Sequence, residues 1–121
     1  EYGITREEIR FWAGSGLAVF FLGFGVFTVW NRSLQKEIMR CGKNRNLFAF
    51  HVCDWNVPTT DFLNDRGLMG DGCINIKEIR GWVEKARFEG FIEVEIFSNK
   101  YWAENQNEYL EKIKKAFIKH T

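Results

Sequence analysis

The stretch Leu-Phe-Ala-Phe-His-Val at residues 47–52 is apolar except for His51. A short, almost continuous apolar run is typical of a parallel β-strand that is buried on both faces. A second stretch, Phe-Ile-Glu-Val-Glu-Ile-Phe at residues 91–97, alternates apolar residues with two glutamates. This period of two also predicts a strand. We therefore expect residues 47–52 and 91–97 to form neighbouring strands of one sheet.

Helix signals separate and follow these two predicted strands. Ser33 can cap a helix that ends at Gly42, Asn75 can cap a second helix, and Asn107 can start a third. The third helix has three apolar residues at helical spacing: Leu110, Ile113 and Phe117. Residues 17–30 are dense in Val, Phe and Leu and are expected to contribute a further strand. Alternating strands and helices indicate parallel βα units and an α/β fold.

Composition limits both the number of domains and the kind of partner. The 121 residues fit one domain. Lys and Arg number 17 and Asp and Glu 16, so the net charge of +1 lacks the basic excess that nucleic-acid binding needs, and no nucleic-acid partner is expected.

The three cysteines are scattered, without a CxxC pair, which excludes a disulfide framework or a zinc knuckle. We expect a cytoplasmic protein, because a reducing compartment fits this cysteine usage.

The N-terminal stretch is anomalously apolar. Residues 11–30 carry no charge and are long enough to cross a bilayer as a helix. Their four glycines, together with Ser15 and Thr28, favour turns and strands instead. We therefore expect a strand beside residues 47–52 and no membrane span. A membrane tether formed by residues 11–30 is the alternative.

A long loop is predicted from residue 53 to residue 74. Loops of this length in compact domains are usually functional or disordered. The loop contains the glycine-rich segment 66–72, which lacks the Gly-Lys-Ser/Thr of a nucleotide-binding loop. Arg66 would offer its planar guanidinium to a polar substrate. The alternative is a glycine-rich surface turn with a solvated arginine.

His51 and Glu95 lie near the carboxyl ends of the two predicted strands. Reactive residues gather at this edge in parallel βα folds, where neighbouring strands are about 4.8 Å apart. An imidazole and a carboxylate that point to the same side there can share one divalent cation. The alternative is structural, with His51 bonded to Asp54 and Glu95 bonded to Arg66. Cys53 is expected to be a small buried apolar residue rather than a thiol nucleophile.

An ordered set of motifs extends this interpretation. The motifs are Phe50-His51-Val52-Cys53-Asp54-Trp55, Pro58-Thr59-Thr60, Asn64-Asp65-Arg66-Gly67-Leu68-Met69-Gly70-Asp71-Gly72 and Ile92-Glu93-Val94-Glu95-Ile96-Phe97-Ser98. Together they resemble the C-terminal part of the sugar phosphate isomerases/epimerases of the xylose isomerase-like TIM-barrel superfamily. That group also contains inosose dehydratases and ketose 3-epimerases. The likeness covers about residues 34–117.

The resemblance implies an α/β fold that is a partial (β/α) TIM barrel, with about three C-terminal βα units and parallel strands. Residues 1–121 would then form one partial domain, in which residues 1–32 are the anomalous apolar stretch and residues 33–121 are the family-like βα units. A closed barrel of this kind needs roughly 250 residues. The chain has about half of that length.

The resemblance also implies an activity and its residues. His51 matches a metal ligand, and Glu95 matches a residue that binds the metal and acts as acid and base. Arg66 matches an arginine that contacts substrate oxygens, and Asp54 is expected to support His51. The cofactor would be Mn²⁺, Mg²⁺ or Co²⁺, and the reaction a metal-assisted proton transfer next to the carbonyl of a sugar or sugar phosphate.

The chain departs from the family pattern in its N-terminal part. The family has two further carboxylate ligands, and residues 23–30, where one would lie, contain neither a carboxylate nor a histidine. We therefore expect this chain alone to bind metal weakly or not at all and to be inactive, as a truncated or frame-disrupted gene product or a fragment would be. The alternative is a non-catalytic accessory protein that needs a partner chain. Open sheet edges would also favour self-association.

Overall fold

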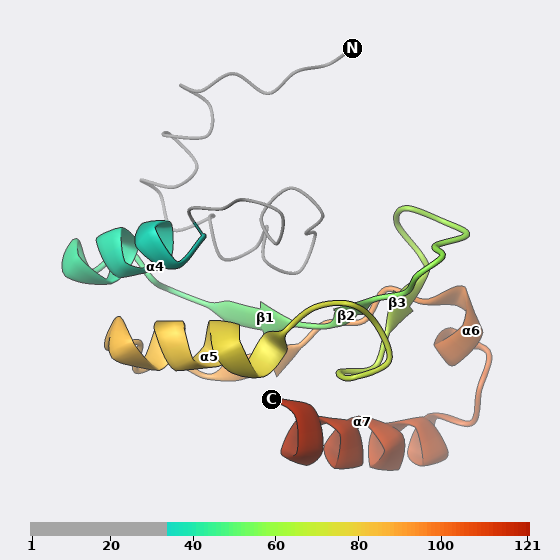
Figure 1. Cartoon of the computed structure of the whole chain (residues 1–121). Helices are drawn as coiled ribbons and strands as arrows, with labels where there is room; N and C mark the ends of the chain where they lie inside the picture. Colours follow the sequence, from blue (N-terminus) through green and yellow to red (C-terminus); the bar gives the residue numbers. More distant parts are fainter. Residues whose placement is uncertain (1–33) are drawn as a thin grey trace.

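The structure is a computed structural model, and it describes residues 34–121 (Figure 1). The elements follow one another as α4 (Leu34–Lys43), β1 (Phe50–Val52), β2 (Asp54–Trp55), β3 (Arg66–Gly67), α5 (Ile76–Lys85), β4 (Ile92–Val94), α6 (Asn99–Trp102) and α7 (Gln106–His120). The strand predicted within residues 17–30 and the alternative membrane tether at residues 11–30 lie outside the described residues. Within residues 34–121, no helix has the length and apolarity to span a bilayer.

The strands β1 and β4 form a parallel pair, as the sequence predicts. Phe50 lies opposite Ile92, and Val52 lies opposite Val94. The hydrogen-bonded ladder continues one step further, because the backbone N–H of Glu95 donates to the carbonyl of Val52 at 3.1 Å. Both strands are shorter than the apolar runs that predict them. The described residues form a part of a barrel and do not close it.

The segment predicted as one long loop contains a second, antiparallel pair of strands. Asp54 of β2 lies opposite Gly67 of β3, and Trp55 lies opposite Arg66. Residues 56–65 connect the two strands. This part of the prediction is therefore corrected, since the loop is folded into a short two-stranded ribbon that starts directly after β1.

The predicted helices at Ser33 and Asn75 are present as α4 and α5. The side chain of Asn75 accepts from the backbone N–H of Glu78 at 3.4 Å and donates to the Glu78 carboxylate at 3.1 Å. The first bond satisfies a backbone N–H at the start of the helix, as an N-cap does, and the second joins the two side chains. The two helices pack against each other, and the backbone of Gly42 approaches that of Ala86 so closely that a Cβ at Gly42 would clash with it.

The last part of the chain differs from the prediction in two ways. Ser98 caps the short helix α6, which the sequence analysis did not anticipate, through a bond from the Tyr101 backbone N–H. Asn105 rather than Asn107 caps α7, and it accepts from two backbone N–H groups. Leu110, expected on the apolar face, is half-exposed, because α7 turns other side chains inward. Those side chains are Tyr109, Ile113, Ala116 and Phe117.

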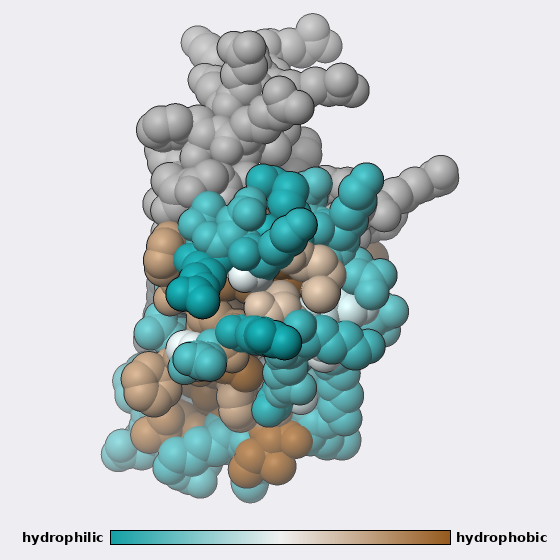
Figure 2. All heavy atoms as spheres, turned by 90° about the vertical axis from the view of Figure 1, so that its left-hand side faces the viewer, coloured by the Kyte–Doolittle hydropathy of each residue, from teal (hydrophilic) through white to brown (hydrophobic). Residues whose placement is uncertain are grey.

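The hydrophobic core lies around the parallel strands. Its most buried members include Phe50 and Val52 of β1 and Met69 of the segment after β3. Figure 1 shows α4 and α5 next to each other at one end of the described part, with α6 at the other end and α7 along one side. Seen from the end at α4 and α5, the surface is mainly hydrophilic, with hydrophobic side chains exposed between the charged ones (Figure 2). The helices therefore support the sheet and leave the carboxyl ends of the strands to the loops.

Candidate functional site

The candidate site lies at the carboxyl ends of β1 and β4. The Nδ1 atom of His51 is 3.1 Å from Oε2 of Glu95, and its Nε2 atom is 2.9 Å from Oε2 of Glu93. His51 lies in β1 and Glu95 directly follows β4, so the prediction that they come from neighbouring parallel strands is confirmed. The prediction that both side chains reach one cation stays a prediction. The His51 side chain is 16% exposed and the Glu95 side chain 28% exposed, so both are accessible to a small ion.

Glu93 is a member of this cluster that the sequence analysis did not select. Its Cα lies directly opposite that of His51 in the parallel pair. The signal was present in the alternation of residues 91–97, because residues two apart in a strand point to the same side of the sheet. Glu93 and Glu95 therefore share the side on which His51 lies. The Glu93 side chain is 58% exposed and is the outermost of the three.

His51 and Glu95 fit the donor requirements of a divalent cation. Adjacent ligands around an octahedral Mg²⁺ ion are about 3.0 Å apart when the metal–oxygen distance is roughly 2.1 Å. The 3.1 Å between the His51 nitrogen and the Glu95 oxygen matches this spacing. Glu93 contacts Nε2, the ring nitrogen on the other side of the imidazole from Nδ1. It therefore adds no third ligand to a cation held between His51 Nδ1 and Glu95. In agreement, residues 34–121 contain no group of three His, Cys, Asp or Glu side chains arranged to hold a metal.

Arg66 is buried in the structure rather than solvated. It is 2% exposed, its guanidinium stacks 3.9 Å from the centre of the Trp55 ring, and Nη2 donates to the carbonyl of Phe62 at 2.5 Å. Burial lowers the pKa of the guanidinium. Within residues 34–121, the buried Nη1 atom has no hydrogen-bond partner. The alternatives of a solvated Arg66 and of a bond from Arg66 to Glu95 are therefore wrong.

Asp54 organises the loop instead of supporting His51 directly. It is fully buried, and its carboxylate accepts backbone N–H groups of Trp55 at 2.8 Å, of Gly70 at 2.9 Å and of Ile74 at 2.9 Å. These bonds tie the start of β2 to the segment that follows β3. The expectation of a bond between Asp54 and His51 is thus corrected, because the loop amides take up both carboxylate oxygens.

Cys53 is buried between the two pairs of strands, as expected for a small apolar residue. Burial raises the pKa of its thiol to about 12. The thiol therefore stays protonated at neutral pH and does not act as a nucleophile. This agrees with the prediction that excluded thiol chemistry at this position.

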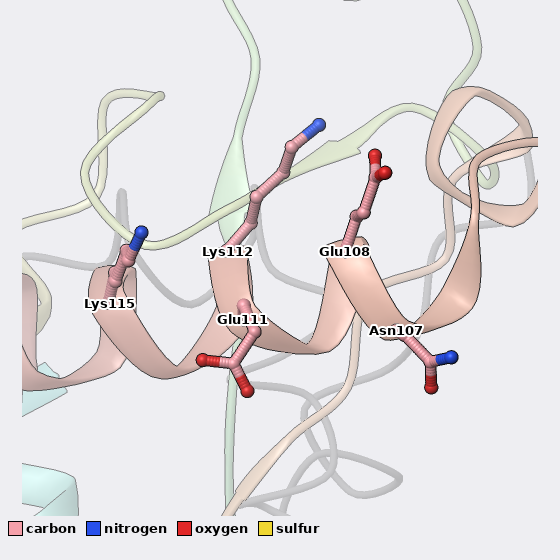
Figure 3. A pocket seen from close by; sticks show the side chains of 5 residues that line it. All are labelled: Asn107, Glu108, Glu111, Lys112 and Lys115. Atoms are coloured by element: carbon pink, nitrogen blue, oxygen red, sulfur yellow. The ribbon is translucent and has the colours of Figure 1, made fainter.

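Two hollows occur on the described surface. One, of about 10 Å³, lies beside β1 and is lined in part by His51, Ile74 and Ile79. The other, of about 440 Å³, lies along α7 and is lined by Asn107, Glu108, Glu111, Lys112 and Lys115. Figure 3 shows that these five side chains all come from one helix, and Glu111 is already paired with Lys114 at 2.6 Å. The hollow along α7 is thus the charged outer face of a helix, and the strand ends are the better candidate site.

The fold agrees with what comparisons with known proteins show. The family model described as xylose isomerase-like TIM barrel matches residues 19–119. The chain belongs to this family. Among solved structures, it is similar to the crystal structure of a protein from Sinorhizobium meliloti 1021, with 42% sequence identity and a TM-score of 0.74. No curated protein matches the chain.

The similarity to the Sinorhizobium meliloti protein covers 76% of this chain and 34% of that protein. The chain therefore spans about a third of the length of its relative. The predicted family and the predicted fold class, a part of a xylose isomerase-like TIM barrel with parallel strands, are confirmed. The roles of His51, Glu95 and Arg66 in that family stay predictions.

Proposed function

We propose that the chain carries part of the site of a metal-dependent sugar isomerase or epimerase. The observation that supports this most strongly is the pair formed by His51 Nδ1 and Glu95 Oε2, 3.1 Å apart at the carboxyl ends of two parallel strands. In this proposal the two residues hold a divalent cation, Mn²⁺, Mg²⁺ or Co²⁺. The cation would polarise the carbonyl and the neighbouring hydroxyl of a sugar.

Glu95 has the second role of moving a proton. A carboxylate within reach of a carbon next to a carbonyl can act as general base and then as general acid. Its backbone is fixed by the bond from its N–H to the carbonyl of Val52. The rigid end of the sheet would therefore hold the carboxylate in a constant orientation towards the substrate.

Arg66 is proposed to bind oxygens of the sugar or sugar phosphate. Stacking on Trp55 and the bond to Phe62 fix the guanidinium plane and leave the buried Nη1 without a partner. A buried donor that lacks an acceptor is unfavourable by about 1–3 kcal/mol. A substrate oxygen placed there would relieve this penalty, so the arginine is prepared for an anionic or hydroxyl-rich ligand.

We further propose that this chain alone binds metal weakly and does not turn over a sugar. Two ligands, one of them neutral, leave most positions of an octahedral ion to water, and hard cations are held mainly by carboxylates. Ligand pockets for small molecules enclose roughly 300–1,000 Å³. The hollow beside His51 encloses about 10 Å³. This observation favours the second candidate, an accessory protein that needs a partner chain to complete the site.

Calorimetric titration of the full chain with Mn²⁺ tests the proposal. We expect weak binding that falls at least tenfold in Glu95→Gln. Glu108→Gln is the matched control, because Glu108 is an exposed carboxylate on α7, away from the strand ends, and its removal should leave the affinity unchanged. Equal losses in both variants would mean that Mn²⁺ binds to surface carboxylates in general, and the proposed site would be wrong.

A ketose epimerisation assay on the same samples separates the two parts of the proposal. No turnover is expected from the isolated chain. Tight binding of one Mn²⁺ per chain, with turnover that is lost in Glu95→Gln, would show that the chain supplies further ligands. The proposed metal site would then stand, and the proposed inactivity would be refuted.

A further inference from the structure

We propose that Glu93 is a positioning residue for His51. Its carboxylate accepts the hydrogen of Nε2 and so keeps the lone pair of Nδ1 directed at Glu95 and at the cation that the two would share. This inference rests on the proposed function for its purpose. Which ring nitrogen of His51 carries the hydrogen can be measured in the chain without metal.

Two contacts of the His51 ring bear on which of its nitrogens carries the hydrogen. Nε2 lies 2.9 Å from a Glu93 oxygen, and Nδ1 lies 3.1 Å from a Glu95 oxygen. A neutral imidazole has one N–H group, and its second nitrogen is an acceptor. Only one of these two contacts can therefore be a hydrogen bond of the neutral ring. The other contact brings a lone pair against a carboxylate oxygen, which is unfavourable until a cation lies between them.

The register of the sheet favours Glu93 as the hydrogen-bond acceptor. Glu93 is paired directly with His51, so the regular part of the ladder fixes the distance between their backbones. Glu95 lies beyond the last paired residue of β4, towards the edge where reactive groups of βα barrels gather. The His51–Glu93 contact is also the shorter of the two.

Solvent exposure leads to the same assignment. The Glu93 side chain is more exposed than that of Glu95 and has less of the burial expected of a metal ligand. Histidines that bind metals almost always donate their other ring N–H to a carboxylate, a carbonyl or water, which fixes the tautomer and the ring orientation. The sequence analysis expected Asp54 to support His51, but the loop amides occupy that carboxylate. Glu93 fills this role instead.

Nuclear magnetic resonance of the ¹⁵N-labelled full chain tests the assignment without metal. Long-range proton–nitrogen correlations at pH 8.5 report which nitrogen of each imidazole carries hydrogen. The chain has two histidines, and the loss of signals in His51→Asn assigns those of His51. We expect the Nε2–H form in the wild type. In Glu93→Ala the Glu95 carboxylate still lies next to Nδ1, so the hydrogen should move to Nδ1.

Three further variants make the result specific. Glu93→Gln replaces the carboxylate by an amide whose NH₂ group can donate to the Nε2 lone pair, so the hydrogen should move to Nδ1 there, as in Glu93→Ala. Glu95→Gln keeps the Glu93 carboxylate and should retain that form. Glu89→Ala removes an exposed carboxylate just before β4 and should change nothing. An Nδ1–H ring or a doubly protonated ring in the wild type, or an unchanged tautomer in Glu93→Ala, would overturn the inference.

Mn²⁺ titration of the same variants distinguishes this inference from the proposed function. If both hold, Glu93→Ala should weaken Mn²⁺ binding by about 10–100-fold, as loss of a supporting carboxylate does. If Glu95→Gln abolishes binding while Glu93→Ala leaves the tautomer and the affinity unchanged, only the inference about Glu93 fails. If the tautomer shifts as expected but Glu95→Gln leaves Mn²⁺ binding unchanged, only the proposed metal site fails.

Discussion

Asp54→Asn should destabilise the fold strongly, because the Asp54 carboxylate holds the start of β2 to the loop behind it. The side chain is fully buried, and one oxygen accepts from Trp55 and Ile74 while the other accepts from Gly70. Asparagine has nearly the same shape but presents one oxygen and one NH₂ group. The substitution therefore keeps two acceptor contacts in weaker form and turns the third into a contact between two donors.

The magnitude follows from these three bonds. Hydrogen bonds to a charged acceptor contribute about 1.5–3 kcal/mol each, and those to a neutral acceptor about 0.5–1.5 kcal/mol. The two bonds on the retained oxygen thus lose roughly 1 kcal/mol each. The N–H of Gly70 loses its acceptor inside the protein, which is unfavourable by about 1–3 kcal/mol. We expect a loss of about 3–5 kcal/mol, a large fraction of the roughly 5–15 kcal/mol that stabilises a typical domain.

Urea unfolding of the full chain, followed by tryptophan fluorescence, measures this loss. Asp61→Asn is the matched control, because Asp61 also accepts two backbone N–H groups, from Leu63 and Asn64, but lies on the exposed part of the loop. Water can replace those bonds, so we expect a much smaller effect. Faster hydrogen exchange at the Gly70 and Ile74 amides would localise the effect of Asp54→Asn. A stability within about 1 kcal/mol of the wild type would refute the reasoning, because three buried bonds to a carboxylate cannot be replaced by water.

Two further predictions concern glycines and cysteines. Gly42→Ala should destabilise the chain by about 1–3 kcal/mol, because its Cβ would clash with the backbone of Ala86. Gly81→Ala is the control within α5, where a Cβ has open space, and it should raise the thermal unfolding temperature, since alanine is favoured in helices by about 1 kcal/mol. Iodoacetamide at pH 8 should label the exposed Cys73 at least tenfold faster than Cys53, whose pKa is raised to about 12, and mass spectrometry of the peptides checks this. Equal labelling rates would show that the region around Cys53 opens readily.

The sequence predicts the parallel strands and the site between them well, for one physical reason. Burial on both faces leaves an apolar run in β1, so that a single polar residue such as His51 stands out within it. Parallel strands place corresponding residues at the same edge, so the proximity of His51 and Glu95 follows from their positions, whereas the register that pairs His51 with Glu93 does not. The sequence does not predict where the strands begin and end, because hydrogen bonding to the neighbouring strand stops before the apolar pattern does.

Other parts of the site depend on contacts between residues that are far apart in the sequence. The bonds from Gly70 and Ile74 to Asp54 close only when the loop returns to the start of β2, and no local pattern encodes that return. The burial of Arg66 has the same origin, because Trp55 becomes its stacking partner through the pairing of β2 with β3. A solvated arginine in a glycine-rich turn and a buried one therefore have the same sequence signature.

Residues 34–121 supply only some of the features that the proposed reaction requires. Two donor atoms at cation spacing and a fixed guanidinium with one unpaired nitrogen are properties of residues 34–121. An enclosed space for a sugar is not among these properties, because the hollow beside His51 encloses about 10 Å³, whereas pockets for small molecules enclose roughly 300–1,000 Å³. Walls from outside residues 34–121 would have to enclose the substrate. Metal binding can therefore be measured on this chain, whereas the lack of turnover in such a measurement would not argue against the proposed roles of His51 and Glu95.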